Sequence, residues 1–257
     1  MRNTSVDTLD STRRSVLALS TTYAYGTLLH WHEHRRAQLL YGATGIMQVQ
    51  SAQGAWVVPP QQAVWIPAGV SHQVCMLGVT TRSLYIEPAD APRSGEGCEV
   101  LGVNPLLQHL LAQAVGMPLL YDEKGRDGAL VALLLHEVAA APELPLHVPL
   151  PQEARLAALC TAFMQAPDIH RTAQDWSVQL HMSLRTFGRH FLEQTGMPFQ
   201  QWRQRACVAH ALSRLAQGDA VTTIAMDMGY DSPGAFSTMF TRIVGKPPSA
   251  LRADLAV

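Results

Sequence analysis

The chain has 257 residues, of which 47% are hydrophobic and 15% are charged, and this size and composition predict two domains that each bury a core of their own. The 19 basic and 20 acidic side chains nearly cancel, so net charge alone does not favour a nucleic-acid partner, although residues 150–257 hold more basic than acidic side chains. The four cysteines lack CxxC and CxxH spacing, which argues against a zinc finger and a disulfide framework and fits a reducing cytoplasm. No apolar run approaches the roughly 18 residues of a membrane helix, so we expect a cytoplasmic protein with no membrane partner.

Residues 1–100 consist of short apolar runs separated by glycines and prolines. Runs such as 46–49 and 64–66 are too short for helices, and turn residues follow each of them. This spacing is typical of an all-β domain, either a small barrel or a sandwich.

Residues 101–141 change to helical spacing. Asn104 is a typical N-cap and Pro105 a typical first-turn residue, and the leucines that follow form a wide apolar stripe on each of two predicted helices. The stripe is explained equally well by helices that cover the β domain and by helices that pair with a second subunit, so a homodimer is one of two expectations. The prolines within residues 142–151 then predict an extended linker.

Residues 152–257 have helical spacing throughout and contain an internal repeat with an offset of 49 residues. A repeat of this kind indicates a duplicated supersecondary unit. The repeated residues are Ser183, Phe187, Phe191, Gly196 and Pro198, which recur as Ser232, Phe236, Phe240, Gly245 and Pro247.

Each copy of the repeat predicts a helix-turn-helix unit. In the first copy, Thr172 and Asp175 have the spacing of a capping box, and Ser183 caps the second helix after a short turn. In the other copy, Ser232 and Pro233 form the cap and the first turn. Two helices joined by a tight turn can place the second helix in the major groove of DNA.

The outer faces of the two second helices differ chemically. Arg185 and Arg189 lie at positions i and i+4, where each can form a bidentate pair with guanine. Gly234 and Thr238, which stand 49 residues later, offer weaker polar contacts. Arginines on a helix are usually solvated surface, but the repeat and the caps favour DNA readout, with the first helix supplying most of the discrimination.

Residues 224–240, IAMDMGYDSPGAFSTMF, and residues 245–249, GKPPS, are the most distinctive segments of this part. Through them the region 155–252 resembles the DNA-binding domain of the AraC/XylS family of bacterial regulators, which implies double-stranded DNA as a partner. In this sequence Gly188, Pro233 and Gly234 replace the polar residues that the family usually has at base-reading positions. The resemblance places those positions at Arg185, Gly188, Arg189, Pro233, Gly234, Ser237 and Thr238.

Histidines alternate near the start of the β domain. His30, His32 and His34 would share one face of a strand. Together with Gln38 and His72 they resemble the two cupin motifs, with glutamine where the metal-binding pattern has glutamate. The candidate metal ligands are the imidazoles of His32, His34 and His72 and the side-chain oxygen of Gln38, a set that suits a divalent transition metal. The alternative is a polar pocket without a metal, which the loss of the carboxylate charge favours.

The resemblance to AraC-type regulators with a cupin-like N-terminal domain implies that this domain binds a small-molecule effector. The function predicted is therefore a DNA-binding regulator controlled by that effector, with RNA polymerase as a further expected partner. Similarity to regulators encoded beside drug-transporter genes implies a repressor of an efflux gene. The alternative is a metal-dependent cupin enzyme fused to a DNA-binding domain, against which the missing glutamate argues. The expected ligand-binding residues are His32, His34, Gln38, His72, Tyr41 and Trp65, of which the two aromatic residues have core packing as their alternative role.

Overall fold

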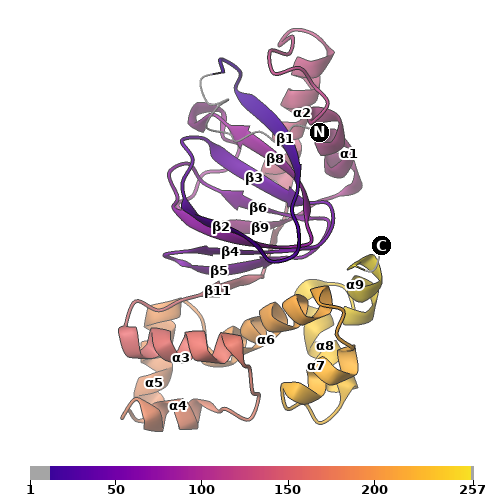
Figure 1. The fold of residues 1–257 in the computed structure, drawn as a ribbon. Helices are drawn as coiled ribbons and strands as arrows, with labels where there is room; N and C mark the ends of the chain where they lie inside the picture. Colours follow the sequence, from indigo (N-terminus) through magenta and orange to yellow (C-terminus); the bar gives the residue numbers. More distant parts are fainter. Residues whose placement is uncertain (1–11, 256–257) are drawn as a thin grey trace. The chain divides into compact units, whose positions relative to one another are not determined.

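The computed structural model describes residues 12–255, and residues 1–11 and 256–257, to which the predicted domains also extend, lie outside the described part. The chain divides into two compact units: residues up to 51 together with 58–144, and residues 52–57 together with 145–257. The first unit consists mainly of strands and the second mainly of helices (Figure 1), as the sequence predicts. Within residues 12–255, no helix is both long enough and apolar enough to cross a bilayer.

The first unit is built on a six-stranded antiparallel sheet with the order β1-β8-β3-β6-β9-β10. At its centre, Leu39 of β3 lies opposite Leu84 of β8 on one side and Trp65 of β6 on the other. Strands β4, β7 and β2 pair in a second antiparallel layer. A short 3-10 turn at Pro88–Asp90 follows β8. The strands are β1 Val16–Thr22, β2 Thr27–His32, β3 Ala37–Gly42, β4 Ile46–Ser51, β6 Gln62–Ile66, β7 His72–Leu77, β8 Thr80–Ile86, β9 Glu99–Gly102 and β10 Glu143–Leu144.

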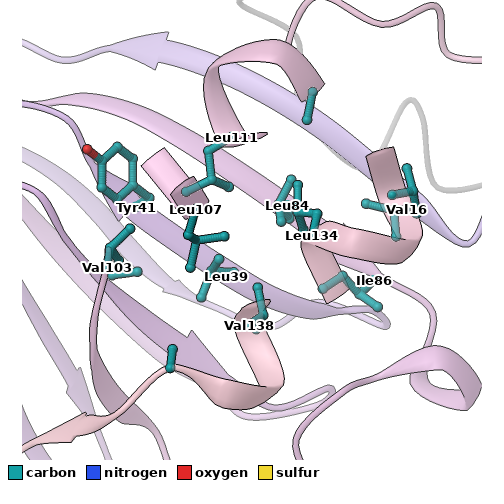
Figure 2. Packing of buried hydrophobic residues seen from close by; sticks show 14 of the residues in the cluster. Val16, Leu39, Tyr41, Leu84, Ile86, Val103, Leu107, Leu111, Leu134 and Val138 are labelled. Carbon is teal, nitrogen blue, oxygen red and sulfur yellow. The ribbon is translucent and has the colours of Figure 1, made fainter. Parts of the chain in front are cut away.

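Helices α1 (Pro105–Ala114) and α2 (Arg126–Ala140) cover one face of the six-stranded sheet (Figure 2). The side chain of Asn104 caps α1 as predicted, because it accepts a hydrogen bond from the backbone nitrogen of Leu107. Burial of each large side chain at this seam contributes about 1.5–3 kcal/mol. The helices therefore cover the sheet, which is one of the two roles that the sequence allows. The seam brings Leu107, Leu111, Leu134 and Val138 of the helices against Val16, Leu39, Leu84 and Ile86 of the strands.

The described part of the second unit joins seven helices to a short ladder made by distant segments. Strand β5 (Gly54–Val58) pairs with β11 (His147–Pro149), so part of the proline-rich stretch expected as a linker is a paired strand. The indole nitrogen of Trp202 donates to the carbonyl of Pro149 at 2.8 Å and holds β11 against α6. The helices are α3 Ala154–Gln165, α4 Ala173–Gln179, α5 Leu184–Thr195, α6 Phe199–Ala216, α7 Val221–Asp227, α8 Pro233–Val244 and α9 Pro248–Leu255.

The residues of the 49-residue repeat occupy equivalent places in the helix pairs α4–α5 and α7–α8. Ser183 and Ser232 cap α5 and α8, each accepting a hydrogen bond from the backbone nitrogen three residues later. Gly196 and Gly245 end the same helices in the left-handed conformation, which glycine adopts without the clash of a Cβ atom. The sequence repeat is therefore a structural duplication. Its phenylalanines, Phe187, Phe191, Phe236 and Phe240, are all fully buried.

Candidate functional site

A cavity of about 640 Å³ lies within the first unit, lined by strands β1, β2, β3, β7 and β8. Its apolar side is formed by residues such as Leu19, Leu40 and Val74, and its polar side by histidines. The only formally charged side chain that lines it, among residues 12–255, is that of Glu33. The other lining residues are Thr21, Tyr23, Leu29, His30, Trp31, His32, His34, Gln38, His72, Met76, Ser83 and Tyr85.

Three of the predicted histidines converge in this cavity. The ring centroids of His32 and His72 lie 4.3 Å apart, and that of His34 lies 4.9 Å from the first and 5.5 Å from the second. One ring nitrogen from each can be chosen so that all three lie within 4.8 Å of one another. The side chain of His30 also lines the cavity but is not part of this cluster. The cluster thus combines the end of β2, the loop after it and the start of β7.

Backbone carbonyls fix the tautomers of two members of the cluster. The Nδ1 atom of His32 lies 2.6 Å from the carbonyl of His30, and that of His72 lies 2.8 Å from the carbonyl of Val70. Because a carbonyl only accepts hydrogen bonds, each Nδ1 carries the proton, and each neutral ring keeps its lone pair on Nε2. The Nε2 atom of His72 is buried without a partner among the described residues. This arrangement is the one that metal-binding histidines use, with the second nitrogen bonded to the protein.

Burial also favours the neutral form of His72. It lowers the pKa of this histidine below the ordinary value, the hydrogen bond to the Val70 carbonyl acts in the opposite direction, and the charge of His32 adds to the lowering. At neutral pH the Nε2 atom of His72 is therefore an acceptor or a ligand rather than a donor.

Gln38 lies on β3 and is buried beside the histidines. Its amide nitrogen donates to the hydroxyl of Tyr85 at 3.0 Å, and its carbonyl oxygen has no partner among the described residues. The buried oxygen is costly unless a ligand satisfies it. Within residues 12–255, Gln38 and His72 therefore each present an unsatisfied acceptor to the cavity.

The assignment of Tyr41 and Trp65 to the ligand pocket is wrong. Both are almost fully buried, at 2% and 1% exposure, in the core between the six-stranded sheet and helices α1 and α2. Side chains alternate along a strand, so on β3 Gln38 and Leu40 face the cavity while Tyr41 faces the helices. Trp65 pairs with Leu39 and shares that second face.

Tyr85, which the sequence offers as a further aromatic candidate, lines the cavity together with Trp31 and Glu33, which the sequence does not assign to the ligand site. Alternation along a strand would place the last two on the face opposite the histidines. The register between β2 and β7 shifts between Leu29 and His32, and the sequence pattern carries no signal of this irregularity. Tyr85 is found through its register, since it lies opposite Gln38 on the neighbouring strand.

The second candidate site is the outer face of the first helix-turn-helix unit. The predicted capping box is present: the hydroxyl of Thr172 accepts from the backbone of Asp175, whose carboxylate accepts from the backbone of Thr172. Aromatic rings from α4, α5 and α6 fill the space beneath α5. Arg185, Gly188 and Arg189 are all exposed on the opposite face.

The two arginines of α5 are available for an external partner. The guanidinium of Arg189, which is 75% exposed, lies 3.8 Å from the exposed carboxylate of Glu193. A pair this long and this exposed contributes little to stability. The capping box and the buried rings set the direction of α5, and its outer face is exposed to solvent.

The outer face of α8 carries smaller side chains. Gly234 and Thr238 are exposed, whereas Pro233 and Ser237 are half-buried. The hydroxyl of Thr238 donates to the carbonyl of Gly234 at 2.9 Å, and so its proton is directed back to the helix. The structure thus keeps all seven predicted DNA-contact residues on the second helices of the two units but gives them unequal exposure.

Comparisons with known proteins agree with these helix pairs. Residues 176–254, from α4 into α9, match the family model described as a helix-turn-helix domain. Over 228 residues the chain is 31% identical to the HTH-type transcriptional regulator NimR of Escherichia coli strain K12. The match covers 87% of this chain and 82% of NimR. The chain is 30% identical over 103 residues to the HTH-type transcriptional regulator RipA of Corynebacterium glutamicum, covering 39% of this chain and 30% of RipA. ToxT from Vibrio cholerae is similar with a TM-score of 0.41 and 10% identity, covering 95% of this chain and 100% of the ToxT chain.

Proposed function

Because the chain belongs to the AraC/XylS family of helix-turn-helix transcriptional regulators, we propose that it reads a DNA operator with α5 and α8 and that a small molecule in the cavity controls this binding. The observation that carries the proposal is the duplicated, capped helix pair with Arg185 and Arg189 exposed on its first copy. The relatives of this chain carry the name of transcriptional regulators. The chain is therefore a DNA-binding regulator rather than the alternative, a metal-dependent enzyme fused to a DNA-binding domain.

Sequence discrimination is assigned mainly to α5. Arg185 and Arg189 can each form a bidentate pair with the O6 and N7 atoms of guanine, which discriminates against other bases by about 1–3 kcal/mol. On α8, half-buried Ser237 and Thr238, with its internally bonded hydroxyl, offer weaker contacts. Helix α8 therefore positions the duplex more than it specifies the sequence.

Fluorescence anisotropy with duplexes from the region upstream of the gene tests the DNA assignment. The variant with both Arg185→Ala and Arg189→Ala is expected to lose sequence-specific binding and retain weak salt-dependent association. The variant with both Lys124→Ala and Arg126→Ala is the matched control, because both side chains are exposed in the first unit and their loss makes the same change in charge. Unchanged specific binding by the double variant would show that α5 is not the reading helix.

In the cavity, we propose that a divalent transition metal such as Zn²⁺ is bound by His32, His34 and His72, with Gln38 as a fourth, oxygen ligand. Two fixed Nδ1 protons, the unpartnered Nε2 atom of His72 and the unpartnered oxygen of Gln38 support this donor set. All four donors are neutral, so the affinity is expected to be lower than at a site that contains a carboxylate. When bound, such a metal would supply a Lewis acid, to which an effector with a donor atom could attach as an additional ligand or in place of the Gln38 oxygen.

The same proposal extends to regulation and assembly. By resemblance to regulators encoded beside drug-transporter genes, we propose that this protein is cytoplasmic and represses an efflux gene. Repression would act by changing the access of RNA polymerase to the promoter. A homodimer is supported by the exposed side chains of Leu106 on α1 and Leu133 on α2, at 47% and 43% exposure. Sedimentation equilibrium tests the dimer, because the variant with both leucines changed to serine should be a monomer. A reporter fused to the neighbouring promoter tests repression, because its expression should rise in a strain that lacks the gene for this protein.

A further inference from the structure

Three glycines lie inside the described helices, and for two of them no contact with the described residues requires glycine. A Cβ atom at Gly128 on α2 would lie 1.9 Å from the carbonyl oxygen of Glu123, so that position needs glycine. A Cβ atom at Gly188 would meet nothing within 4 Å, and one at Gly234 would meet only the hydroxyl of Ser232 at 3.8 Å. Both unexplained glycines lie on the second helices of the helix-turn-helix units.

The backbone does not explain these two glycines either. Neither has a positive φ, in contrast to Gly196 and Gly245, which end the same helices. Glycine is the poorest helix former after proline because it loses the most backbone freedom on folding. Gly188 is the fifth residue of the 12-residue helix α5, so the helix carries this disadvantage in its interior.

The two glycines stand in the faces assigned to DNA. Gly188 lies three residues after Arg185 and directly before Arg189, and all three are exposed. Gly234 takes the place in α8 that Arg185 takes in α5, two residues after the capping serine. Each second helix therefore has one residue without a side chain on the face that would meet the groove.

From this placement, and resting on the DNA binding proposed above, we propose that at Gly188 and Gly234 the helix backbone lies directly against base edges in the major groove. Gly188 on α5 determines specificity, and Gly234 lets α8 seat closely on the duplex. The absence of Cβ lets α5 enter the groove deeply enough for the guanidinium groups of Arg185 and Arg189 to reach guanine in bidentate geometry. A methyl group at Gly188 or Gly234 would occupy space that belongs to the duplex, although it fits the free protein without a clash.

The experiment uses a duplex that the full-length wild-type protein enriches from a random-sequence pool. Gly188→Ala is expected to raise the melting temperature of the free protein and to weaken binding to that duplex at least tenfold, with binding to an unselected duplex unchanged. Gly234→Ala is expected to act in the same direction. Reselection with Gly188→Ala is expected to change the base preferred at one or two positions of the site, which a purely structural role would not do.

Ala158→Gly provides the matched control, because Ala158 is exposed on α3 and the change removes a methyl group from another helix. Ala158→Gly is expected to lower the melting temperature and to leave binding to the selected duplex unchanged. The double variant Ala158→Gly with Gly188→Ala should have the wild-type melting temperature and the weakened DNA binding of Gly188→Ala. Wild-type affinity in both glycine variants would overturn the inference while the DNA-binding function stands, provided that the arginine variants lose affinity. If the wild-type protein enriches no duplex, the proposed function and this inference fall together.

Discussion

The hydroxyl of Thr238 donates a hydrogen bond to the backbone carbonyl of Gly234, at 2.9 Å and one turn earlier in α8. The proton that could have been offered to a base is therefore used within the helix, a common arrangement for threonine inside helices. On α5 the equivalent residue is Arg189, whose donors face outward. Two positions related by the internal repeat thus differ in whether they can donate to DNA.

Thr238→Val should consequently have a small effect on DNA affinity. Valine preserves the shape and removes only a hydroxyl that already has a partner, so a loss of no more than about threefold is expected. Arg189→Ala removes a potential bidentate contact and should cost about 1–3 kcal/mol, or roughly five- to 150-fold in affinity. Anisotropy titrations at one fixed salt concentration compare the two variants. Equal losses would mean that Thr238 releases its internal bond when DNA binds.

Metal binding by the histidine cluster should appear as a change in stability. Addition of Zn²⁺ or Ni²⁺ to the full-length protein is expected to raise the melting temperature, because a ligand that binds only the folded state stabilises it. His72→Ala should abolish the shift, whereas His30→Ala, which changes a histidine of the same cavity outside the cluster, should retain it. A melting temperature of the wild-type protein that does not change with added metal would contradict the proposal.

Local signals in the sequence predict the helical unit well. The caps at Thr172, Ser183 and Ser232 depend on hydrogen bonds to residues within three positions, so the sequence contains both partners. The same is true of Asn104 at the start of α1. The repeat adds a second, independent copy of the pattern, which is why the duplicated fold could be predicted before the structure was known.

Contacts between distant segments explain what the sequence could not show. Tyr41 and Gln38 belong to one strand, and only the position of α1 and α2 decides which of its two buried faces encloses a ligand cavity. An alternating pattern is informative when one face is solvated, and here neither face is. The pairing of Trp56 with His147, between segments 91 residues apart, is likewise invisible in the composition of the proline-rich stretch.

Two adjacent arginines should differ sharply in their contribution to stability. The side chain of Arg36 is fully buried, lies 2.7 Å from the carboxylate of Glu87 and donates to the carbonyls of Thr12, Arg14 and Ser15. Its replacement by alanine leaves these carbonyls without that donor and opens a cavity, for which a loss of about 3–5 kcal/mol is expected.

Arg35→Ala is the matched comparison, because Arg35 binds the same carboxylate from a side chain that is 51% exposed. A loss of about 1 kcal/mol or less is expected for this exposed pair. Urea unfolding followed by circular dichroism measures both variants. Similar losses would show that burial does not decide the value of these ion pairs.

The free energy of unfolding should also decrease as the pH is lowered, because of His147. The ring of this histidine stacks on that of Trp56 with centroids 4.5 Å apart and an interplanar angle of 6°. Burial lowers the pKa of His147 to about 4, a hydrogen bond to the backbone of Gln53 opposes the lowering, and the charge of Arg205 adds to it. The unfolded chain, in which a histidine has a pKa of about 6.5, therefore takes up a proton at a higher pH than the folded chain does. The contribution is complete above about pH 6.5 and is lost as the pH falls towards 4, at about 1.4 kcal/mol per pH unit.

His147→Phe keeps an aromatic ring on Trp56 and removes the titrating group. Between pH 7 and pH 5, wild-type protein is expected to lose about 2 kcal/mol more of its free energy of unfolding than this variant does. Carboxylates and the other histidines titrate in both proteins, so the difference between the two curves isolates His147. Parallel curves in urea unfolding at these pH values would mean that the folded protein protonates His147 as readily as the unfolded chain does, because its ring is hydrated rather than enclosed beside Trp56.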